Sequence, residues 1–316
     1  MAKNRIGIDV GGTNIKIALV DKKGEILYSN TIPTRSEMGY EYTINNMKQA
    51  ISTLLTEKKL TASNIESIGF GFPGQIDYKE GIVKALPNIP GWVNVPISNI
   101  IEKEFGITTK IDNDVRCAAL GELNYGAGVG CENLICITVG TGIGSGIIVN
   151  GKLVRGASNA AGEIGHIKLF PNGEHLCGCG DYGCLEAYVS GPSIVQMAEE
   201  YIQGGKSTKY REMANPDITP FIVAQAAEQG DGVARRIFTK MGEYLGTGLA
   251  SVVNLLNPEK IIIGGGVAGS GDLLLAPLKE TLMKRAMPIS AQAVEIVPAK
   301  LGNRAGVIGA SLLAES

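Results

Sequence analysis

The residues with the clearest chemistry are three cysteines and one histidine near the middle of the chain. Cys177, Cys179 and Cys184 lie within eight residues of one another, and His166 lies eleven residues before the first of them. Thiolate sulfur and imidazole nitrogen together suit tetrahedral Zn²⁺, and one histidine with three cysteines fills all four positions. A filled shell leaves no position for an activated water, so we expect a structural metal ion with the chemistry beside it.

Two other interpretations of this segment stay open. The cysteines could be free thiols in a glycine-rich loop, with His166 as an ordinary core histidine. His175 is a rival fourth ligand, although its place two residues before Cys177 would strain the coordination geometry. We favour zinc with His166 because the loop offers little apolar surface and needs another source of rigidity.

A glycine–threonine turn between two predicted strands occurs twice. Residues 8–13 read Ile-Asp-Val-Gly-Gly-Thr, and residues 137–141 read Ile-Thr-Val-Gly-Thr. Such a turn presents backbone N–H groups and a hydroxyl to one point, which suits a phosphate, although a plain hairpin is the alternative. The sequence is not a Walker A motif, since it lacks Gly-Lys-Ser/Thr and the following helix. The repetition predicts two similar α/β lobes that bind a nucleotide phosphate.

Polar residues also stand where predicted strands end. Asn113 and Asp114 follow a strand predicted at 107–111 and precede a helix predicted at 115–125. Ligands collect at the carboxyl ends of strands in α/β folds, so at least one of the pair should face a substrate, while the other can cap the helix. Asp9, at the end of the first strand, could hold Mg²⁺ through water or simply satisfy its turn.

The composition excludes several classes of protein. The 316 residues are 44% hydrophobic and 19% charged, which predicts two domains or one large bilobed unit with an ample core. A net charge of −2 gives no indication of a nucleic-acid partner. No apolar run reaches the ~18 residues of a membrane helix, and no apolar signal segment precedes the first strand. Clustered cysteines fit a reducing compartment, so we expect a cytoplasmic protein.

Hydrophobic periodicity predicts alternating strands and helices along the chain. A buried strand predicted at 260–263 runs into Gly264, Gly265 and Gly266. These glycines could lie against an adenosine or allow close helix–strand packing. Trp92, in a Pro/Gly loop, is expected to anchor packing. The main helices are expected at 38–60, 96–105, 115–125, 193–203, 221–228, 232–256, 273–283 and 305–313, and the main strands at 25–32, 65–72, 82–85, 107–111, 134–139, 147–150, 260–263 and 293–297.

At these residues the chain resembles the ROK family of sugar kinases, repressors and uncharacterised proteins, within the actin-like ATPase superfamily. The resemblance covers essentially the full length. The cysteine pattern is specific to the family, and the glycine turns belong to the wider superfamily. The sequence as a whole is most similar to the family's glucokinases. The motifs that carry the resemblance are Asp9-x-Gly-Gly-Thr13, Asn113-Asp114, Gly140-Thr-Gly-x-Gly144, Glu163-x-Gly-His166, Cys177-x-Cys179-Gly-x-x-Gly-Cys184-x-Glu186 and Ile263-Gly-Gly-Gly266.

The resemblance implies a two-lobed actin-like ATPase (ribonuclease H-like) α/β fold with a structural zinc loop. A small lobe would comprise residues 1–114 and 303–316, and a large lobe, residues 115–302, would carry the zinc loop. The implied activity is ATP-dependent phosphorylation of a hexose, with glucose expected first, at the 6-hydroxyl in a cleft between the lobes. The family also implies a homodimer.

The resemblance further implies roles for individual residues. Asp114 would be the general base, and Asn113 would hold neighbouring sugar hydroxyls. The remaining sugar contacts would come from Gly74, Asn88, Glu163, His166 and Glu186, so that His166 would both ligate zinc and orient the sugar. The residues implied to bind ATP with its Mg²⁺ are Asp9, Gly11, Gly12, Thr13, Asn14, Lys16, Gly140, Thr141, Gly142, Gly144, Gly265 and Gly266.

Two alternatives differ in function. The chain could be a kinase for N-acetylmannosamine, fructose, mannose or allose, because the implied contacts reach hydroxyls that many hexoses share. It could instead be a sugar-responsive transcriptional repressor, a class that carries an N-terminal helix-turn-helix extension in this family. A first strand beginning by Ile6 and a slightly acidic charge argue against the repressor. A phosphate donor other than ATP, such as polyphosphate, stays open.

Overall fold

The computed structural model describes residues 3–86, 89–214 and 216–316, which form two compact units. The first unit comprises Met1–Glu132, Gly146–Gly162 and Ala299–Ser316, and the second comprises Asn133–Ser145 and Glu163–Pro298. The chain therefore leaves the first unit and returns to it twice. Among the described residues, no helix is both long enough and apolar enough to span a membrane.

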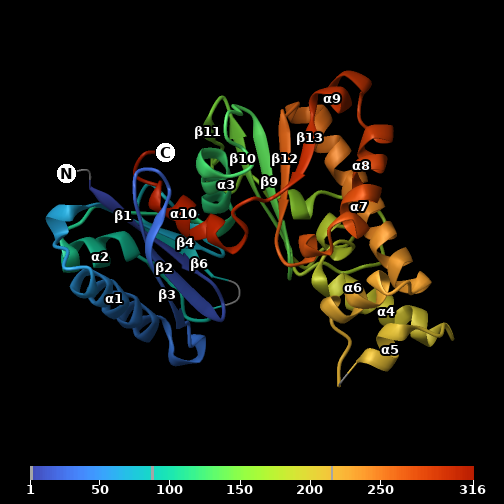
Figure 1. Cartoon of the computed structure of the whole chain (residues 1–316), viewed down its shortest axis with the longest axis horizontal. Helices are drawn as coiled ribbons and strands as arrows, with labels where there is room; N and C mark the ends of the chain where they lie inside the picture. The colour runs from blue at the N-terminus through green and yellow to red at the C-terminus, as the bar shows by residue number, and fades with distance from the viewer. Residues whose placement is uncertain (1–2, 87–88, 215) are drawn as a thin grey trace. The chain divides into compact units, whose positions relative to one another are not determined.

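The first unit is built on a mixed five-stranded sheet in the order β3-β2-β1-β4-β8, of which Figure 1 labels β1 to β4. The pairs β1–β2 and β2–β3 are antiparallel, whereas β4 runs parallel to both β1 and β8. The carboxyl ends of β1 and β8 consequently lie at the same edge of the sheet. The strands are β1 (Asn4–Val10), β2 (Asn14–Val20), β3 (Ile26–Pro33), β4 (Ile65–Phe72) and β8 (Thr109–Asn113).

Helices cover both faces of this sheet, because successive residues of β1 point to opposite faces and both faces are packed. Ile6 and Ile8 enter a core with apolar residues of α1 (Tyr40–Glu57) and α2 (Ile97–Phe105). Gly7 points to the other face, where a side chain would overlap the backbone of α10 (Ala305–Ser311). The remaining helix of this unit, α3 (Asp114–Tyr125), packs against α10, β4 and β8.

A small antiparallel sheet of β5 (Gln75–Asp77), β6 (Ile82–Ala85) and β7 (Val93–Val95) extends the first unit. Trp92 precedes β7, is 1% exposed, and its ring lies 5.3 Å from that of Phe72. The expectation that this tryptophan anchors packing is confirmed.

The second five-stranded sheet has the order β11-β10-β9-β12-β13. Its strands are β9 (Leu134–Val139), β10 (Ile143–Val149), β11 (Lys152–Leu153), β12 (Lys260–Gly264) and β13 (Glu295–Pro298), and β12 runs parallel to β9 and β13. Helices of the second unit are α4 (Gly191–Gln203), α5 (Lys209–Met213), α6 (Pro220–Glu228), α7 (Gly232–Leu256), α8 (Asp272–Arg285) and α9 (Pro288–Ala293).

Several elements differ from the expected pattern: β5, β7, β11 and α5 were not expected, and the strand expected at 107–111 lies at Thr109–Asn113. The strand expected at 147–150 begins four residues earlier, at Ile143, and includes Gly144 and Gly146. A glycine is required at position 146 because a Cβ there would overlap Ala119 of α3. A strand expected to begin at 293 is preceded by the unpredicted helix α9, which Pro288 starts at its first position.

The lobe boundaries implied by the sequence, at residues 114 and 303, stay a prediction. The compact units are divided differently, because residues 115–132 and 146–162 group with the first unit. The physical reason is the packing of α3 against α10, which holds the helix after Asp114 beside the C-terminal helix.

Candidate active site

The junction of β8 and α3 presents Asn113 and Asp114. Asn113 is the N-cap of α3, and its side-chain oxygen accepts hydrogen bonds from the backbone N–H groups of Val115 (3.0 Å) and Arg116 (3.3 Å). Asp114 is the first residue of the helix, and its Oδ1 lies 2.9 Å from the Val115 nitrogen. The two residues therefore divide the roles expected of them, since Asn113 makes the cap and leaves the Asp114 carboxylate at the helix N-terminus.

The electrostatic surroundings of Asp114 favour its protonated form. Burial and, to a smaller extent, the negative charge of Asp9 together raise its pKa from 3.8 to about 6, while hydrogen bonds from Val115 and Asn113 oppose the shift. Burial also raises the pKa of Asp9, while Lys16, with its Nζ 3.5 Å from Asp9 Oδ2, lowers it. Two interacting carboxyl groups at the same sheet edge form an arrangement that a divalent cation would stabilise.

The first glycine–threonine turn lies beside this acidic pair, between β1 and β2. The Gly11 N–H donates to the Asn14 carbonyl at 2.9 Å, and the Thr34 hydroxyl donates to the Gly11 carbonyl at 2.6 Å. Gly12, Thr13 and Asn14 are exposed. The turn is thus held from beneath by backbone and hydroxyl groups while its tip faces solvent, as a phosphate-binding turn requires.

The second turn, between β9 and β10, is held by a carboxylate. The Gly140 N–H donates to the Gly142 carbonyl at 2.9 Å, and Glu186 Oε2 accepts the N–H of Ile143 at 2.7 Å. A side chain on Gly142 would overlap that carboxylate. Thr141 is exposed at the tip.

The glycines after β12 differ from each other. Gly265 has φ +89°, and a Cβ on it would overlap the backbone of Val139 in β9. A Cβ on Gly266 would meet nothing within 4 Å. The packing alternative left open for this segment therefore explains Gly265, and Gly266 is the glycine whose surface is open to a ligand.

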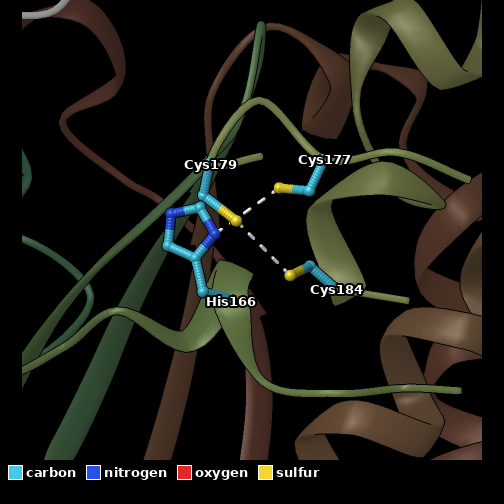
Figure 2. A group of neighbouring side chains, drawn as sticks. All are labelled: His166, Cys177, Cys179 and Cys184. Atoms are coloured by element: carbon cyan, nitrogen blue, oxygen red, sulfur yellow. Dashed lines mark hydrogen bonds between the residues drawn. The ribbon is translucent and has the colours of Figure 1, made fainter. Parts of the chain in front are cut away.

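The cysteines and histidine singled out in the sequence come together (Figure 2). One ligand atom from each of His166, Cys177, Cys179 and Cys184 lies within 4.8 Å of all the others. His166 Nδ1 is 3.5 Å from Cys177 Sγ, and Cys179 Sγ is 3.7 Å from Cys184 Sγ. With Zn–S about 2.3 Å and Zn–N about 2.0 Å, a tetrahedral ion places a nitrogen and a sulfur about 3.5 Å apart and two sulfurs about 3.8 Å apart. The donor set fits zinc.

Neighbouring groups support this donor set. Burial raises the pKa of the Cys177 thiol to about 12, so the thiolate that a metal requires needs a cation at neutral pH. Lys168 Nζ lies 3.2 Å from Cys184 Sγ and 2.6 Å from Asp181 Oδ2, where its charge offsets the excess negative charge of three thiolates. The ring of the rival ligand His175 instead stacks on Tyr188, with centroids 4.4 Å apart.

His166 uses its two ring nitrogens differently. Nδ1 faces the cysteines, while Nε2 is 4.0 Å from Glu163 Oε2. A metal on Nδ1 fixes the proton on Nε2, which then donates outward. Glu186 likewise connects two features, because its Oε1 lies 3.6 Å from Cys177 Sγ while its Oε2 holds the second turn.

The other predicted site residues are placed as follows. The Gly74 N–H donates to the Phe72 carbonyl at 3.1 Å, just after β4, and Asn113 Nδ2 is 3.5 Å from the same carbonyl. Gly144 lies within β10 and not in the turn. Asn88 lies outside the described residues. Arg116, 4% exposed and paired with Asp112, was not singled out in the sequence; its i, i+4 spacing from an acid is the signal that could have found it.

Two five-stranded sheets, each with a glycine–threonine turn, define an actin-like ATPase fold, here with a loop that fits a zinc site. The ROK family model matches residues 5–316, and the chain belongs to the ROK family. It is 39% identical to a glucokinase of Halalkalibacterium halodurans over 98% of this chain and 94% of that one.

Two further comparisons mark the range of the family. A ROK family glucokinase from Streptomyces griseus, solved with glucose and AMPPNP, has a TM-score of 0.82 and 33% identity, covering 99% of this chain and 100% of that chain. A xylose repressor of Caldicellulosiruptor bescii is 34% identical over 96% of this chain but only 76% of that protein. Kinases of the family therefore match over nearly their whole length, whereas about a quarter of the repressor has no counterpart in the match.

Proposed function

We propose that this protein is a hexose kinase that transfers the terminal phosphoryl group of ATP to the 6-hydroxyl of glucose. Membership of the ROK family and 39% identity to a glucokinase over nearly the whole chain support this function. The related glucokinase solved with glucose and AMPPNP, an ATP analogue, supports the same pair of substrates.

The observation that carries the proposal is the carboxyl group of Asp114. A sugar hydroxyl hardly ionises near neutral pH, so transfer benefits from a base that accepts its proton as the new bond forms. With a pKa of about 6, Asp114 is ionised at neutral pH and is a stronger base than an ordinary aspartate. The proton moves from the 6-hydroxyl to the carboxylate while the hydroxyl oxygen attacks the terminal phosphorus of ATP, and the bond from that phosphorus to the bridging oxygen breaks as ADP leaves.

The sugar is assigned to groups that hydrogen-bond hydroxyls. Asn113 uses its oxygen for the helix cap, which leaves its NH₂ group as a donor. Glu163 supplies acceptors, and the Nε2–H of His166 supplies a donor whose direction the metal fixes. Glu186 would offer the sugar its remaining acceptor capacity, since its Oε2 already accepts from the Ile143 N–H.

The nucleotide is assigned to the two turns and to the segment after β12. Gly12 and Thr141 are exposed at the tips of the turns, where backbone N–H groups suit phosphate oxygens, and Gly266 offers an open surface for the adenosine. Asp9 would hold Mg²⁺, which neutralises charge on the phosphates. Phosphoryl transfer asks mainly for in-line positioning and such neutralisation, and backbone turns provide both.

We infer in addition that the Cys₃His set holds a structural Zn²⁺, and that the protein is a cytoplasmic homodimer without a nucleic-acid or membrane partner. The distances between the ligand atoms support the metal. The dimer rests on the family alone, and sedimentation equilibrium tests it.

The decisive experiment measures ADP release by the wild type and by Asp114→Asn over a panel of sugars. We expect glucose to give the highest kcat/KM, and the substitution to lower kcat by about 10²–10⁴-fold while the protein stays folded. A folded Asp114→Asn protein with full turnover contradicts the proposed mechanism. A higher kcat/KM for N-acetylmannosamine or fructose would change the substrate but keep the reaction class.

A further inference from the structure

A network of buried charged side chains lies at the N-terminal end of α3, next to the proposed general base Asp114. Asp112 is 0% exposed; its Oδ1 is 3.2 Å from Arg116 Nη1, and its Oδ2 is 2.7 Å from Arg155 Nε. The same Oδ1 accepts the backbone N–H of Asn113 at 2.8 Å. One carboxylate thus connects the end of β8, the first turn of α3 and a residue 43 positions later in the chain.

The far side of the Arg116 guanidinium holds a loop of the same unit. Its Nη2 donates to the carbonyl oxygens of Asn159 (2.8 Å) and Ala161 (2.9 Å). Residues 154–163 form neither strand nor helix, so this fork is a main support of the loop. Immediately afterwards, the chain passes through Gly162, with φ +97°, into Glu163 and leaves the first unit.

We propose that Arg116 is a positioning residue for the hexose. Its hydrogen bonds hold residues 159–161 against the helix that begins with Asp114. The backbone just before Glu163 and His166, two residues assigned to the sugar, is thereby fixed in position. The inference rests on the proposed function for its kinetic consequence. It goes beyond that function by assigning sugar affinity to a buried side chain that carries neither the base nor a sugar-binding group.

Arg116 acts by position and not by charge. The pKa of Asp114 is raised by burial and by the charge of Asp9, whereas both guanidinium groups are paired with Asp112. Asp112 stands between Arg116 and Arg155 and offsets their charges locally. Replacing Arg116 should therefore leave the pH dependence of turnover unchanged, which a direct electrostatic role would not.

The planar fork of arginine is essential to this arrangement. One nitrogen contacts Asp112 while another reaches two carbonyl groups, a geometry that the single ammonium group of lysine does not reproduce. Removing the fork should still allow folding, because Asp112 keeps Arg155 and the Asn113 N–H as partners.

The test compares Arg116→Met with Arg5→Met. Arg5 is a matched control: it is 1% exposed, lies in the same unit, and contacts the Asp21 carbonyl, the Tyr125 hydroxyl and Glu315. For Arg116→Met we expect the hexose KM to rise about tenfold or more, with the ATP KM within about twofold and an unchanged pH midpoint. Backbone amide exchange over residues 157–166 should accelerate. Arg5→Met should show neither the selective KM change nor the faster exchange.

Equal increases of both KM values in Arg116→Met, or a hexose KM like that of the wild type, would overturn the inference. Arg116→Lys is the second variant, in case the methionine protein does not fold; it should raise the hexose KM in the same direction. If the wild type phosphorylates no hexose, the proposed function is wrong. The amide exchange measurement still tests whether Arg116 holds residues 159–161 in place. Unchanged exchange over residues 157–166 in both Arg116 variants would then refute it.

Discussion

The two glycine–threonine turns have similar backbones but different supports. In each, the first glycine donates its N–H across the turn at 2.9 Å, from Gly11 to Asn14 and from Gly140 to Gly142. Beneath the first turn lies the neutral hydroxyl of Thr34. Beneath the second lies a carboxylate that also approaches a thiol of the metal loop.

This difference shows that a repeated motif need not have a repeated support. The first turn depends on its own sheet and lies next to the titrating pair Asp9 and Asp114. The second turn depends on Glu186, and therefore on whatever fixes Cys177. We expect the first turn to be sensitive to pH and the second to be sensitive to the metal.

Removing the metal should separate the two turns most strongly. Wild-type protein should contain about one zinc per chain, and Cys179→Ser should lower activity by about 100-fold or more, because the two remaining thiols and His166 cannot keep the loop ordered without the cation. The amide of Ile143 should then exchange faster while that of Gly11 does not change. Stability and activity retained without bound metal would contradict the structural role.

A matched pair of substitutions tests the supports directly. Gly142→Ala places a Cβ against the Glu186 carboxylate, whereas a Cβ at Gly12 meets nothing within 4 Å. We expect Gly142→Ala to lower the free energy of unfolding by about 1–3 kcal/mol and Gly12→Ala to change it by less than about 0.5 kcal/mol. Thermal unfolding of both proteins measures the difference, and equal losses would show that the two turns are supported alike.

The pH profile sharpens the description of the first turn. Because Asp114 must be ionised to accept a proton and its pKa is raised to about 6, kcat/KM should be high at neutral pH and fall to half at about pH 6. A profile that stays flat down to pH 5 would show that this carboxyl group does not titrate in the productive step.

The smallest expected effect concerns stability near the same acid. A carboxyl group with a raised pKa stabilises the fold below its unfolded pKa of 3.8, and that contribution is lost as the pH rises through about 6. Asp114→Asn removes the buried charge, so it should stabilise the protein at pH 8 by about 1–3 kcal/mol even as it removes activity. The gain should vanish below about pH 4. Thermal unfolding at both pH values measures it, and a loss of stability at pH 8 would refute the argument.

Local sequence patterns were sufficient for the features that depend on nearby residues. The four donors His166, Cys177, Cys179 and Cys184 were predicted because they occupy one short segment, and the structure brings them together. The two turns were predicted because each strand–glycine–strand pattern is complete within about ten residues. The same local rules predicted that one of Asn113 and Asp114 caps the helix but not which, and in the structure the cap is Asn113.

Features that depend on distant partners could not be predicted in this way. The contact of Arg116 with Asn159 joins residues 43 positions apart, and no periodicity indicates it. The packing role of Gly265 could not be distinguished from a nucleotide contact, because Val139 approaches it only once β9 and β12 pair. Helix α9 was missed because six residues are too few for a periodic signal.

The close approach of α10 to the first sheet has a consequence for biosynthesis. Gly7 and Gly69 are bare so that the backbone of this helix can lie directly on β1 and β4, yet the helix begins at residue 305 of the chain. A ribosome therefore makes the sheet first, then all of the second unit, and only afterwards the segment that covers the sheet. Until α10 is made, the parts of β1 and β4 that it covers stay exposed on the nascent protein, so the first unit cannot complete its packing before the end of synthesis.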